Sequence, residues 1–326
     1  MTKTSGRLVL AALAAAWALL APVARAEESC ALRGDVVVPK GVAISDSAGT
    51  DIAQFTGAKI AISVSGFPSS GSARAKIQTV GFRVEGYVRA REIPVYTMRS
   101  VPAYAGHVWI GEGRRVSIIG SAPGKLHVEK SVTSPVNGTF HGWAPCDAFT
   151  LTERVPPGWT PPGSARGYVL RRDRIDLHSS EQGDVVTSLE RGGDGAGLLL
   201  WSTDRSGSWI HVEHHSDIVL DGWVRASDVN PLPEGETMDQ LAPSPIQHGA
   251  PTLNIQGQPK IVHVDRTVAL RAAASDAAGT IGGIDPGTDV MLMDIVAGWA
   301  SVLPKGLGVS PMGTNQFWVR AKDIGL

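Results

Sequence analysis

Short runs in which apolar and polar residues alternate cover most of the chain after residue 30. Examples are residues 60–64, 116–118 and 268–270, in which valine, isoleucine or leucine returns at every second position. An alternation with a period of two indicates strands that bury one face. Glycines stand in many of the breaks between runs, where they suit turns, and no window has an amphipathic helical stripe. The pattern predicts an all-β protein of many short strands.

A seven-residue phrase recurs four times, each time after a stretch of such runs. The four copies begin at Tyr87, Trp143, Trp223 and Trp318. A glycine precedes the first three copies, whereas Phe317 precedes the fourth. A phrase that returns at the end of similar stretches indicates a repeated structural unit.

The copies divide the chain into four units and two linkers. We expect unit 1 at residues 27–93, unit 2 at 94–152, unit 3 at 168–230 and unit 4 at 261–326. Linkers are expected at residues 153–167 and 231–260, both rich in proline. The prolines of the first linker favour an extended segment, but none forms a pair spaced by three, which argues against an internal polyproline ligand.

Residues 1–26 have the features of a secretory signal peptide. Lys3 and Arg7 form a charged start, residues 8–20 form an apolar run, and Ala24 and Ala26 supply the small residues of a cleavage site. The apolar run is too short to be a convincing membrane span. We therefore expect an exported protein, periplasmic or extracellular, with no membrane insertion after signal cleavage.

The charge of the chain argues against nucleic acid as a partner. The net charge is −1, and removal of the signal peptide leaves 27 basic against 31 acidic residues. Such a mildly acidic chain has no basic patch that would attract nucleic acid or anionic lipid. We expect neither as a ligand.

The chain has two cysteines, Cys30 and Cys146. In an exported protein, a disulfide between them is the first interpretation, and a loop of that length could stabilise the fold by roughly 4 kcal/mol in a chain-entropy treatment. Two alternatives remain. Cys146 takes a place held by alanine in the other copies of the phrase, so it could be a small buried side chain, and the third role is that of a nucleophile.

Units 3 and 4 carry a resemblance to a known family. Unit 4 has, in order, Leu270 and Arg271, a Gly-x-Ile turn at 279–281, a Gly-x-x-Val-x-Leu strand at 287–292, Trp299, and the pair Trp318 and Val319. This order resembles bacterial SH3-like (SH3b) domains. Unit 3 matches through Gly192, Trp209, Gly222 and Trp223, and units 1 and 2 match in outline. The resemblance implies tandem small SH3-like β-barrels joined by Pro-rich linkers.

Few residues suggest chemistry. His211, Glu213 and His215 would share one face of a strand, but structural zinc usually needs four ligands, and we expect a polar face with no metal. His141 lies five residues before Cys146, a spacing that invites comparison with cysteine–histidine hydrolases. Because Cys146 lies inside the repeated phrase and no segment is left to house a catalytic domain, we expect no catalytic residue and no cofactor.

Aromatic residues are the remaining candidates for a binding site, since SH3-type folds bind peptides in aromatic-lined grooves. The candidate groove residues are Tyr96, Tyr104, Trp109 and Trp201, with core packing as the alternative for each. We therefore expect an exported, non-catalytic binding or scaffold protein of the bacterial envelope, with peptidoglycan peptide or an envelope protein as partner. The alternatives are an accessory subunit with protein–protein contacts alone and a cell-wall hydrolase using Cys146 and His141.

Overall fold

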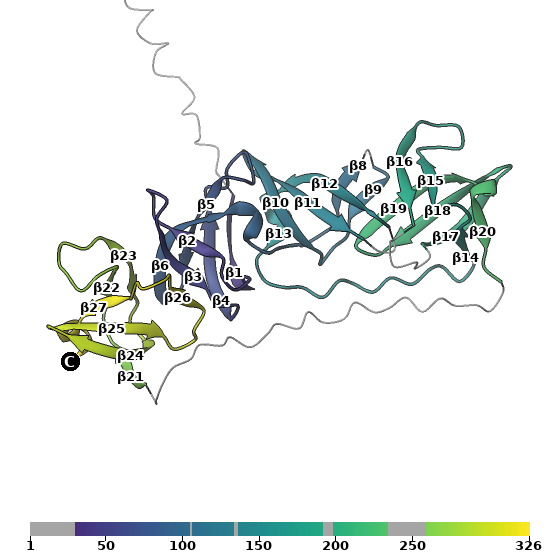
Figure 1. The fold of residues 1–326 in the computed structure, drawn as a ribbon. Coiled ribbons are helices and arrows are strands. Elements are labelled where there is room, and N and C mark those ends of the chain that lie inside the picture. Colours follow the sequence, from purple (N-terminus) through teal and green to yellow (C-terminus); the bar gives the residue numbers. More distant parts are fainter. Residues whose placement is uncertain (1–29, 105, 134–135, 192–197, 234–258) are drawn as a thin grey trace, which may run out of the picture.

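The computed structural model describes residues 30–104, 106–133, 136–191, 198–233 and 259–326, and strands dominate these residues (Figure 1). The described helices are short 3-10 turns: η1 (Ala90–Glu92), η2 (Cys146–Ala148), η3 (Ala226–Asp228) and η4 (Ala321–Ile324). The predicted all-β class is confirmed. The predicted signal peptide and most of the second linker lie outside the described residues.

The strands form three sheets, and the largest combines the first and last units of the chain. Its 13 strands come from unit 1 and unit 4. Unit 1 contributes β1 (Ala31–Val37), β2 (Ala43–Ser45), β3 (Asp51–Phe55), β4 (Lys59–Ser65), β5 (Arg74–Thr79) and β6 (Phe82–Arg89). Unit 4 contributes β21 (Lys260–Val264), β22 (Val268–Arg271), β23 (Thr280–Ile284), β24 (Thr288–Val296), β25 (Trp299–Pro304), β26 (Val309–Pro311) and β27 (Trp318–Arg320).

The other two sheets hold units 2 and 3. A sheet of five strands contains β7 (Val95–Thr97), β10 (Arg115–Ala122), β11 (Lys125–Val132), β12 (Gly138–Pro145) and β13 (Phe149–Thr150). A sheet of nine strands begins with two strands of unit 2, β8 (Val101–Tyr104) and β9 (Val108–Ile110). Unit 3 supplies its other strands, β14 (Arg166–Leu170), β15 (Arg174–His178), β16 (Val185–Glu190), β17 (Leu199–Ser206), β18 (Trp209–His215), β19 (Ile218–Arg225) and β20 (Val229–Pro231).

The closed barrels expected from the sequence are not found, because none of these three sheets closes on itself in the described part of the chain. Strand edges pair with a neighbouring unit instead. β6 pairs with β23 of unit 4, where Val84 lies opposite Gly282. β19 pairs with β9 of unit 2, where Val219 lies opposite Trp109. The strand edges that would have to pair with each other to close a barrel within one unit are therefore hydrogen-bonded to another unit.

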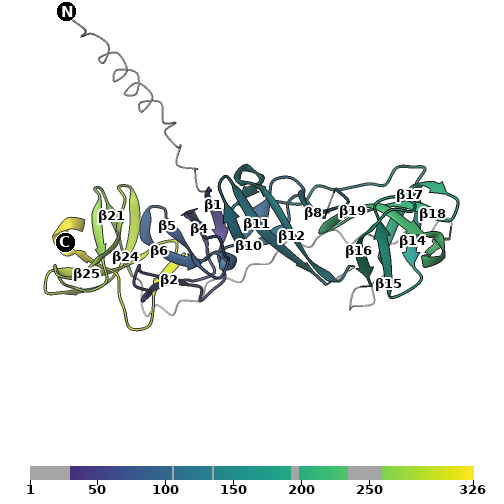
Figure 2. The same cartoon turned by 90° about the horizontal axis from the view of Figure 1, so that it is seen from above.

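The units lie in a row whose order differs from their order in the chain. Figures 1 and 2 both show unit 4 beside unit 1, followed by unit 2 and then unit 3 at the far end. The last unit thus returns to the first. Buried apolar side chains form one continuous cluster through all four units, so the junctions between units belong to the core.

The repeated phrase has the same local structure in each unit, a strand followed directly by a 3-10 turn. The glycine before it faces a backbone carbonyl of β2, β8 or β15, and a Cβ would lie 2.6 Å from that oxygen at Gly86, 2.5 Å at Gly142 and 2.8 Å at Gly222. Only glycine permits such a close approach of two backbones. This contact explains why glycine recurs at the position before the aromatic residue.

Unit 4 has Phe317 at this position, and the side chain serves a different purpose. Phe317 is buried, and its ring centroid lies 5.4 Å from that of Phe82 in unit 1. Next to this pair, the Arg83 Nε lies 2.8 Å from an oxygen of Asp285. Strand β26 adds a second antiparallel pairing with β3. The fourth copy departs from the repeat where unit 4 docks on unit 1.

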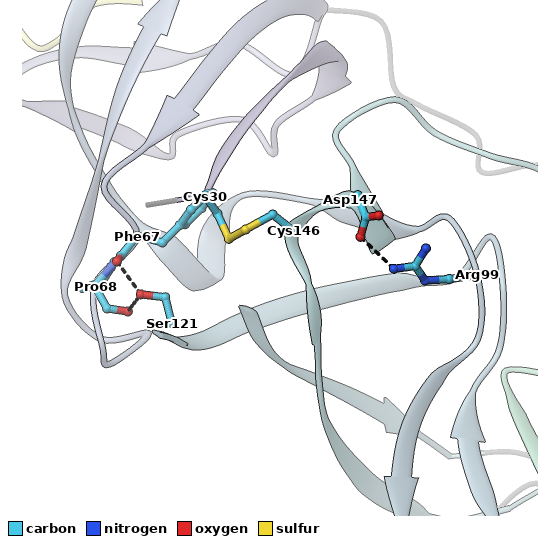
Figure 3. The surroundings of a disulfide bond; sticks show 7 residues. All are labelled: Cys30, Phe67, Pro68, Arg99, Ser121, Cys146 and Asp147. Carbon is cyan, nitrogen blue, oxygen red and sulfur yellow. Dashed lines mark hydrogen bonds and ion pairs between the residues drawn. A yellow bond between two sulfur atoms is a disulfide. The ribbon is translucent and has the colours of Figure 1, made fainter. Parts of the chain in front are cut away.

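A disulfide joins units 1 and 2, as the sequence predicts. It links Cys30 to Cys146 with the Cα atoms 5.5 Å apart and closes a loop over a sequence separation of 116 (Figure 3). Close by, the Ser121 hydroxyl of unit 2 donates to the Phe67 carbonyl of unit 1 at 2.5 Å. A disulfide is consistent with an oxidising, exported location.

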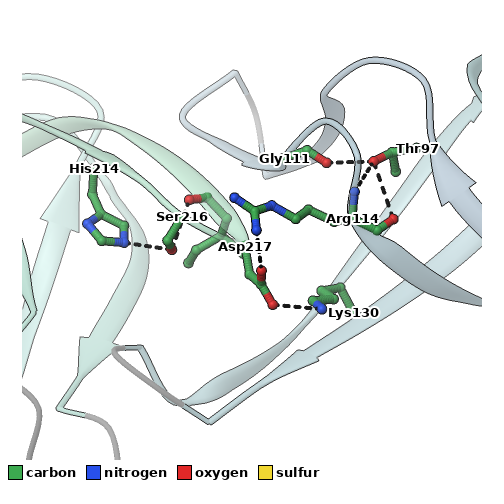
Figure 4. A network of polar contacts seen from close by, with 8 residues as sticks. Thr97, Gly111, Arg114, Lys130, His214, Ser216 and Asp217 are labelled. Atoms are coloured by element: carbon green, nitrogen blue, oxygen red, sulfur yellow. Dashed lines mark hydrogen bonds and ion pairs between the residues drawn. The ribbon is translucent and has the colours of Figure 1, made fainter. Parts of the chain in front are cut away.

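Units 2 and 3 meet around a pair of charge contacts (Figure 4). The Asp217 carboxylate of unit 3 lies 2.9 Å from the Arg114 guanidinium and 2.7 Å from the Lys130 ammonium, both in unit 2. All three side chains are mostly shielded from solvent. Because one carboxylate serves two cations at the junction, it fixes how unit 3 is oriented on unit 2.

Candidate functional site

An aromatic, imidazole and carboxylate cluster lies on the outer face of strands β11 and β12, here named the unit 2 face. His127 lies opposite Trp143, and Glu129 lies opposite His141. The rings of His127 and Trp143 stack at 4.5 Å with an angle of 7° between them. Trp143 is 45% exposed. The Arg91 guanidinium lies 3.5 Å from Glu129, so opposite charges stand beside the stacked rings.

The same cluster recurs at the same register on strands β18 and β19 and is named the unit 3 face. His211 lies opposite Trp223, with ring centroids 5.1 Å apart, and Glu213 lies opposite Asp221. The His211 Nε2 lies 2.7 Å from an Asp221 oxygen. His215 extends the face and lies 3.6 Å from Glu213. Units 2 and 3 thus present His and Trp in one cross-strand pair and a carboxylate in the next.

Units 1 and 4 lack this combination although they share the repeated phrase. In unit 1 the aromatic residue is Tyr87, which lies opposite Lys76. In unit 4 it is Trp318, which lies opposite Ser301. A feature required for the fold alone would be expected in all four units. Among the described residues only units 2 and 3 have this combination, so the repeated phrase does not by itself require it.

Burial lowers the pKa of one imidazole on each face, which favours its neutral form. Burial, and then the neighbouring His141, lower the pKa of His127. Burial likewise lowers the pKa of His215, against the opposing effect of Glu213. A neutral imidazole is both a donor and an acceptor. Each face therefore offers a flat aromatic surface, imidazole nitrogens and carboxylates, which suit a peptide with amide and amino groups.

A shallow hollow adjoins the unit 3 face. It is lined by Trp201, His211 and Glu213, by Ser202 and Thr203 of β17, and by Pro162 and Ala165 of the first linker. The Trp201 indole Nε1 is buried and has no hydrogen-bond partner among the described residues. An unpaired buried donor is costly, so this N–H group beside the hollow would gain from an acceptor.

The four aromatic candidates from the sequence do not lie together. Trp201 lines the hollow. Tyr96 is buried, and burial raises its pKa. Tyr104 packs edge-on against Phe140, with ring centroids 6.2 Å apart. Trp109 lies in β9 at the junction with unit 3.

The other candidate residues have local partners. Among the described residues, no group of three or more His, Cys, Asp or Glu side chains is placed to hold a metal ion. His211 and His215 instead face Asp221 and Glu213. Cys146 is bonded to Cys30, so its thiol is not free to act as a nucleophile. His141 faces Glu129 at 3.8 Å.

His214 points to the opposite side of β18 and is buried. Its Nδ1 lies 2.7 Å from the Leu199 carbonyl and must donate to it, so Nε2 accepts from the Ser216 hydroxyl, also at 2.7 Å. Both contacts suit the neutral ring. Burial lowers the pKa of His214 to about 4. His214 lies three positions before Asp217, which forms the charge contacts at the junction with unit 2.

We expect this histidine to destabilise the protein in acid. The His214 imidazole binds a proton near pH 6.5 in the unfolded chain. In the folded chain it binds the proton only near pH 4. Between these values the unfolded state holds more protons, so the free energy of unfolding falls as the pH drops, by about 3 kcal/mol in all. Urea unfolding of the native chain and of His214→Gln at pH 7.5 and pH 4 measures the effect. The difference in free energy of unfolding between the two chains should be smaller at pH 4 than at pH 7.5. An unchanged difference would contradict the role given to His214.

The two faces share a short sequence signal that the seven-residue phrase does not include. His-Val-Glu occurs at residues 127–129 and again at 211–213, each followed by a Gly-Trp pair at 142–143 and 222–223. The hairpins between these motifs differ in length, which hides the correspondence. Only the strand register places each histidine opposite its tryptophan.

Comparison with known proteins adds no assignment. No protein-family model matches the chain, and no curated protein matches it. Within the described residues, no helix combines the length and apolar character needed to cross a membrane.

Proposed function

We propose that this chain is an exported, non-catalytic binding protein of the bacterial envelope, built from SH3-like units and binding cell-wall peptide on the unit 2 face. The observation that carries the proposal is the His and Trp pair beside a carboxylate, which recurs at one register in units 2 and 3 alone. The recurrence of a strand and 3-10 turn in four units supports the SH3-like interpretation. The disulfide and the features of residues 1–26 support export.

The chemistry of the unit 2 face suits an extended peptide with free amino and carboxylate groups. Trp143 and His127 form one stacked surface against which an aliphatic side chain or a peptide plane can lie. Glu129 can accept hydrogen bonds from an amino group, and Arg91 can bind a carboxylate. A cell-wall peptide combines these groups. Neutral sugars and nucleic acid offer no such pairing of amine and carboxylate.

Replacement of Trp143 by alanine is expected to weaken binding to purified peptidoglycan about thirtyfold. A tryptophan at the centre of a binding surface commonly contributes about 2 kcal/mol or more, and this side chain is exposed, so its loss should leave folding intact. Co-sedimentation with peptidoglycan across a range of protein concentrations measures the apparent Kd. If the native chain co-sediments with peptidoglycan at none of the salt concentrations tested, the cell-wall proposal is wrong.

Trp318→Ala is the matched control for this experiment. Trp318 occupies the same place in the repeated phrase, but it lies opposite Ser301 and has no histidine partner. We expect this variant to bind peptidoglycan as the native chain does. Equal weakening by both substitutions would assign the effect to the fold and not to the unit 2 face.

An accessory subunit that contacts only another protein is the second candidate. The observation in its favour is a group of exposed apolar side chains in unit 4: Ile261, Met293, Ile295 and Val296. Exposed apolar patches commonly mark protein–protein contacts. Isolation of a stable complex with one envelope protein, together with no affinity for wall fragments, would favour this candidate over the first.

A further inference from the structure

The first linker lies against the unit 3 face. The Trp159 ring stacks on His215, with centroids 4.1 Å apart and an angle of 9° between the planes. Further along, Pro162 and Ala165 line the same hollow as Trp201. Figure 1 shows this segment as the long connection from β13 to β14. The chain therefore covers part of its own unit 3 face through Trp159, Pro162 and Ala165, and residues 155–165 are here named the covering segment.

The covering segment is held at its start by unit 2. Just before it, the Arg154 guanidinium lies 3.5 Å from Glu112. At Gly113 a Cβ would lie 2.7 Å from the Pro156 Cα, so the backbone of the segment passes directly over this glycine. At its other end the segment continues into β14 of unit 3. A segment tethered at both ends has a high effective concentration at the face between them.

The fit of the covering segment is incomplete. Under the segment, Trp201 lines the hollow, and its buried indole N–H has no acceptor among the described residues. An external ligand that offered a carbonyl or carboxylate to this group would make a hydrogen bond that the covering segment does not make. The covering segment thus has the properties of an occupant that a better ligand can displace.

The unit 2 face provides the contrast within the same chain. It has the same cross-strand pairs, yet Trp143 is 45% exposed there. One face is therefore open and the other is covered by a tethered segment. The proline pairs at 156–157 and 161–162 keep the segment extended on either side of Trp159. The Trp159 ring, which lies between these two pairs, stacks on His215. The segment has no prolines spaced by three.

We propose that the unit 3 face is a peptide-binding surface, that the covering segment is its built-in and displaceable occupant, and that its external ligand is an extended peptide with an aromatic residue between prolines. The inference rests on the proposed function only in taking these faces to bind peptides. It does not require that the open unit 2 face binds the cell wall. An external peptide must compete with the tethered segment, so its apparent affinity for the native chain is reduced.

A labelled synthetic peptide with the sequence of residues 153–165 tests the proposal. Fluorescence anisotropy would measure its binding to three full-length chains, all carrying Trp143→Ala so that the unit 2 face does not contribute. The first has no other change, the second adds Trp159→Ala to release the cover, and the third adds both Trp159→Ala and Trp201→Ala. We expect the second chain to bind about tenfold more tightly than the first, and the third to lose binding.

Three results would overturn the proposal: equal binding by the first two chains, no binding by either, or retained binding by the third. A measurement without ligand guards against misfolded variants. In the otherwise native chain, Trp159→Ala should move the NMR-determined pKa of His215 upward, because burial holds it low and the Trp159 ring covers this imidazole. Peptidoglycan is absent from this experiment, so its outcome is separate from that of the co-sedimentation assay.

Discussion

Replacement of Phe317 by alanine is expected to lower the free energy of unfolding by about 3–5 kcal/mol, the usual cost of deleting a buried phenylalanine ring. Phe317 is 1% exposed and packs on Phe82, so the substitution empties the contact between unit 4 and unit 1. The other contacts there include strand pairings, the Thr56 hydroxyl on the Leu307 carbonyl, and the partly buried pair of Arg83 and Asp285. We therefore expect unit 4 to separate from unit 1 before the rest unfolds.

Urea unfolding and small-angle scattering together measure this result. Loss of docking should appear as an early unfolding step and as a larger radius of gyration in the absence of urea. Ile295→Ala is the control, because this side chain of unit 4 is 50% exposed and should change stability by less than about 0.5 kcal/mol. A Phe317→Ala chain with native dimensions and a loss below about 1 kcal/mol would contradict the role given to this side chain.

Removal of the disulfide is expected to be nearly as costly. The bridge closes a loop over a sequence separation of 116, for which chain entropy gives about 4–5 kcal/mol. Cys30→Ala/Cys146→Ala should lower the free energy of unfolding by a similar amount, measured by urea unfolding. Alanine suits both sites, because Cys30 is buried and the other copies of the phrase have alanine at the place of Cys146.

Reduction of the native chain is the control for this double substitution. A reducing agent breaks the same bond and leaves the side chains in place, so both treatments should lower stability equally. If the double variant were destabilised and the reduced native chain were not, the cost would belong to packing at Cys30. If both the double substitution and reduction lowered the free energy of unfolding by less than about 1 kcal/mol, the disulfide would restrict the unfolded chain only slightly.

The strands were predictable from the sequence, whereas their closure was not. Alternation at residues 60–64 or 268–270 identifies which side of a strand is buried. It carries no information on the partner of the free edge. Gly282 resembles a turn residue in the sequence, yet it lies in β23 with φ +154°, where a Cβ would come 1.9 Å from the Arg83 carbonyl of unit 1. Pairing between remote units depends on such contacts and escapes local analysis.

The candidate site was predictable only in part, for a related reason. Trp201 follows from the expectation that aromatic residues line a binding groove, and it does line the hollow. His127 and Trp143 are 16 residues apart in the sequence and become neighbours through the register of β11 and β12. The contact of Trp159 with His215 is still less visible, because the first linker lacks the proline spacing of a known ligand.

The return of unit 4 to unit 1 has a consequence for the order of events during biosynthesis. β6 and β3 come early in the chain, and the strands that cover their edges, β23 and β26, come much later. Whenever the amino-terminal part emerges first, those edges stay bare until β23 and β26 follow, and another chain could pair on them. A chain truncated before β23 should therefore be prone to aggregate.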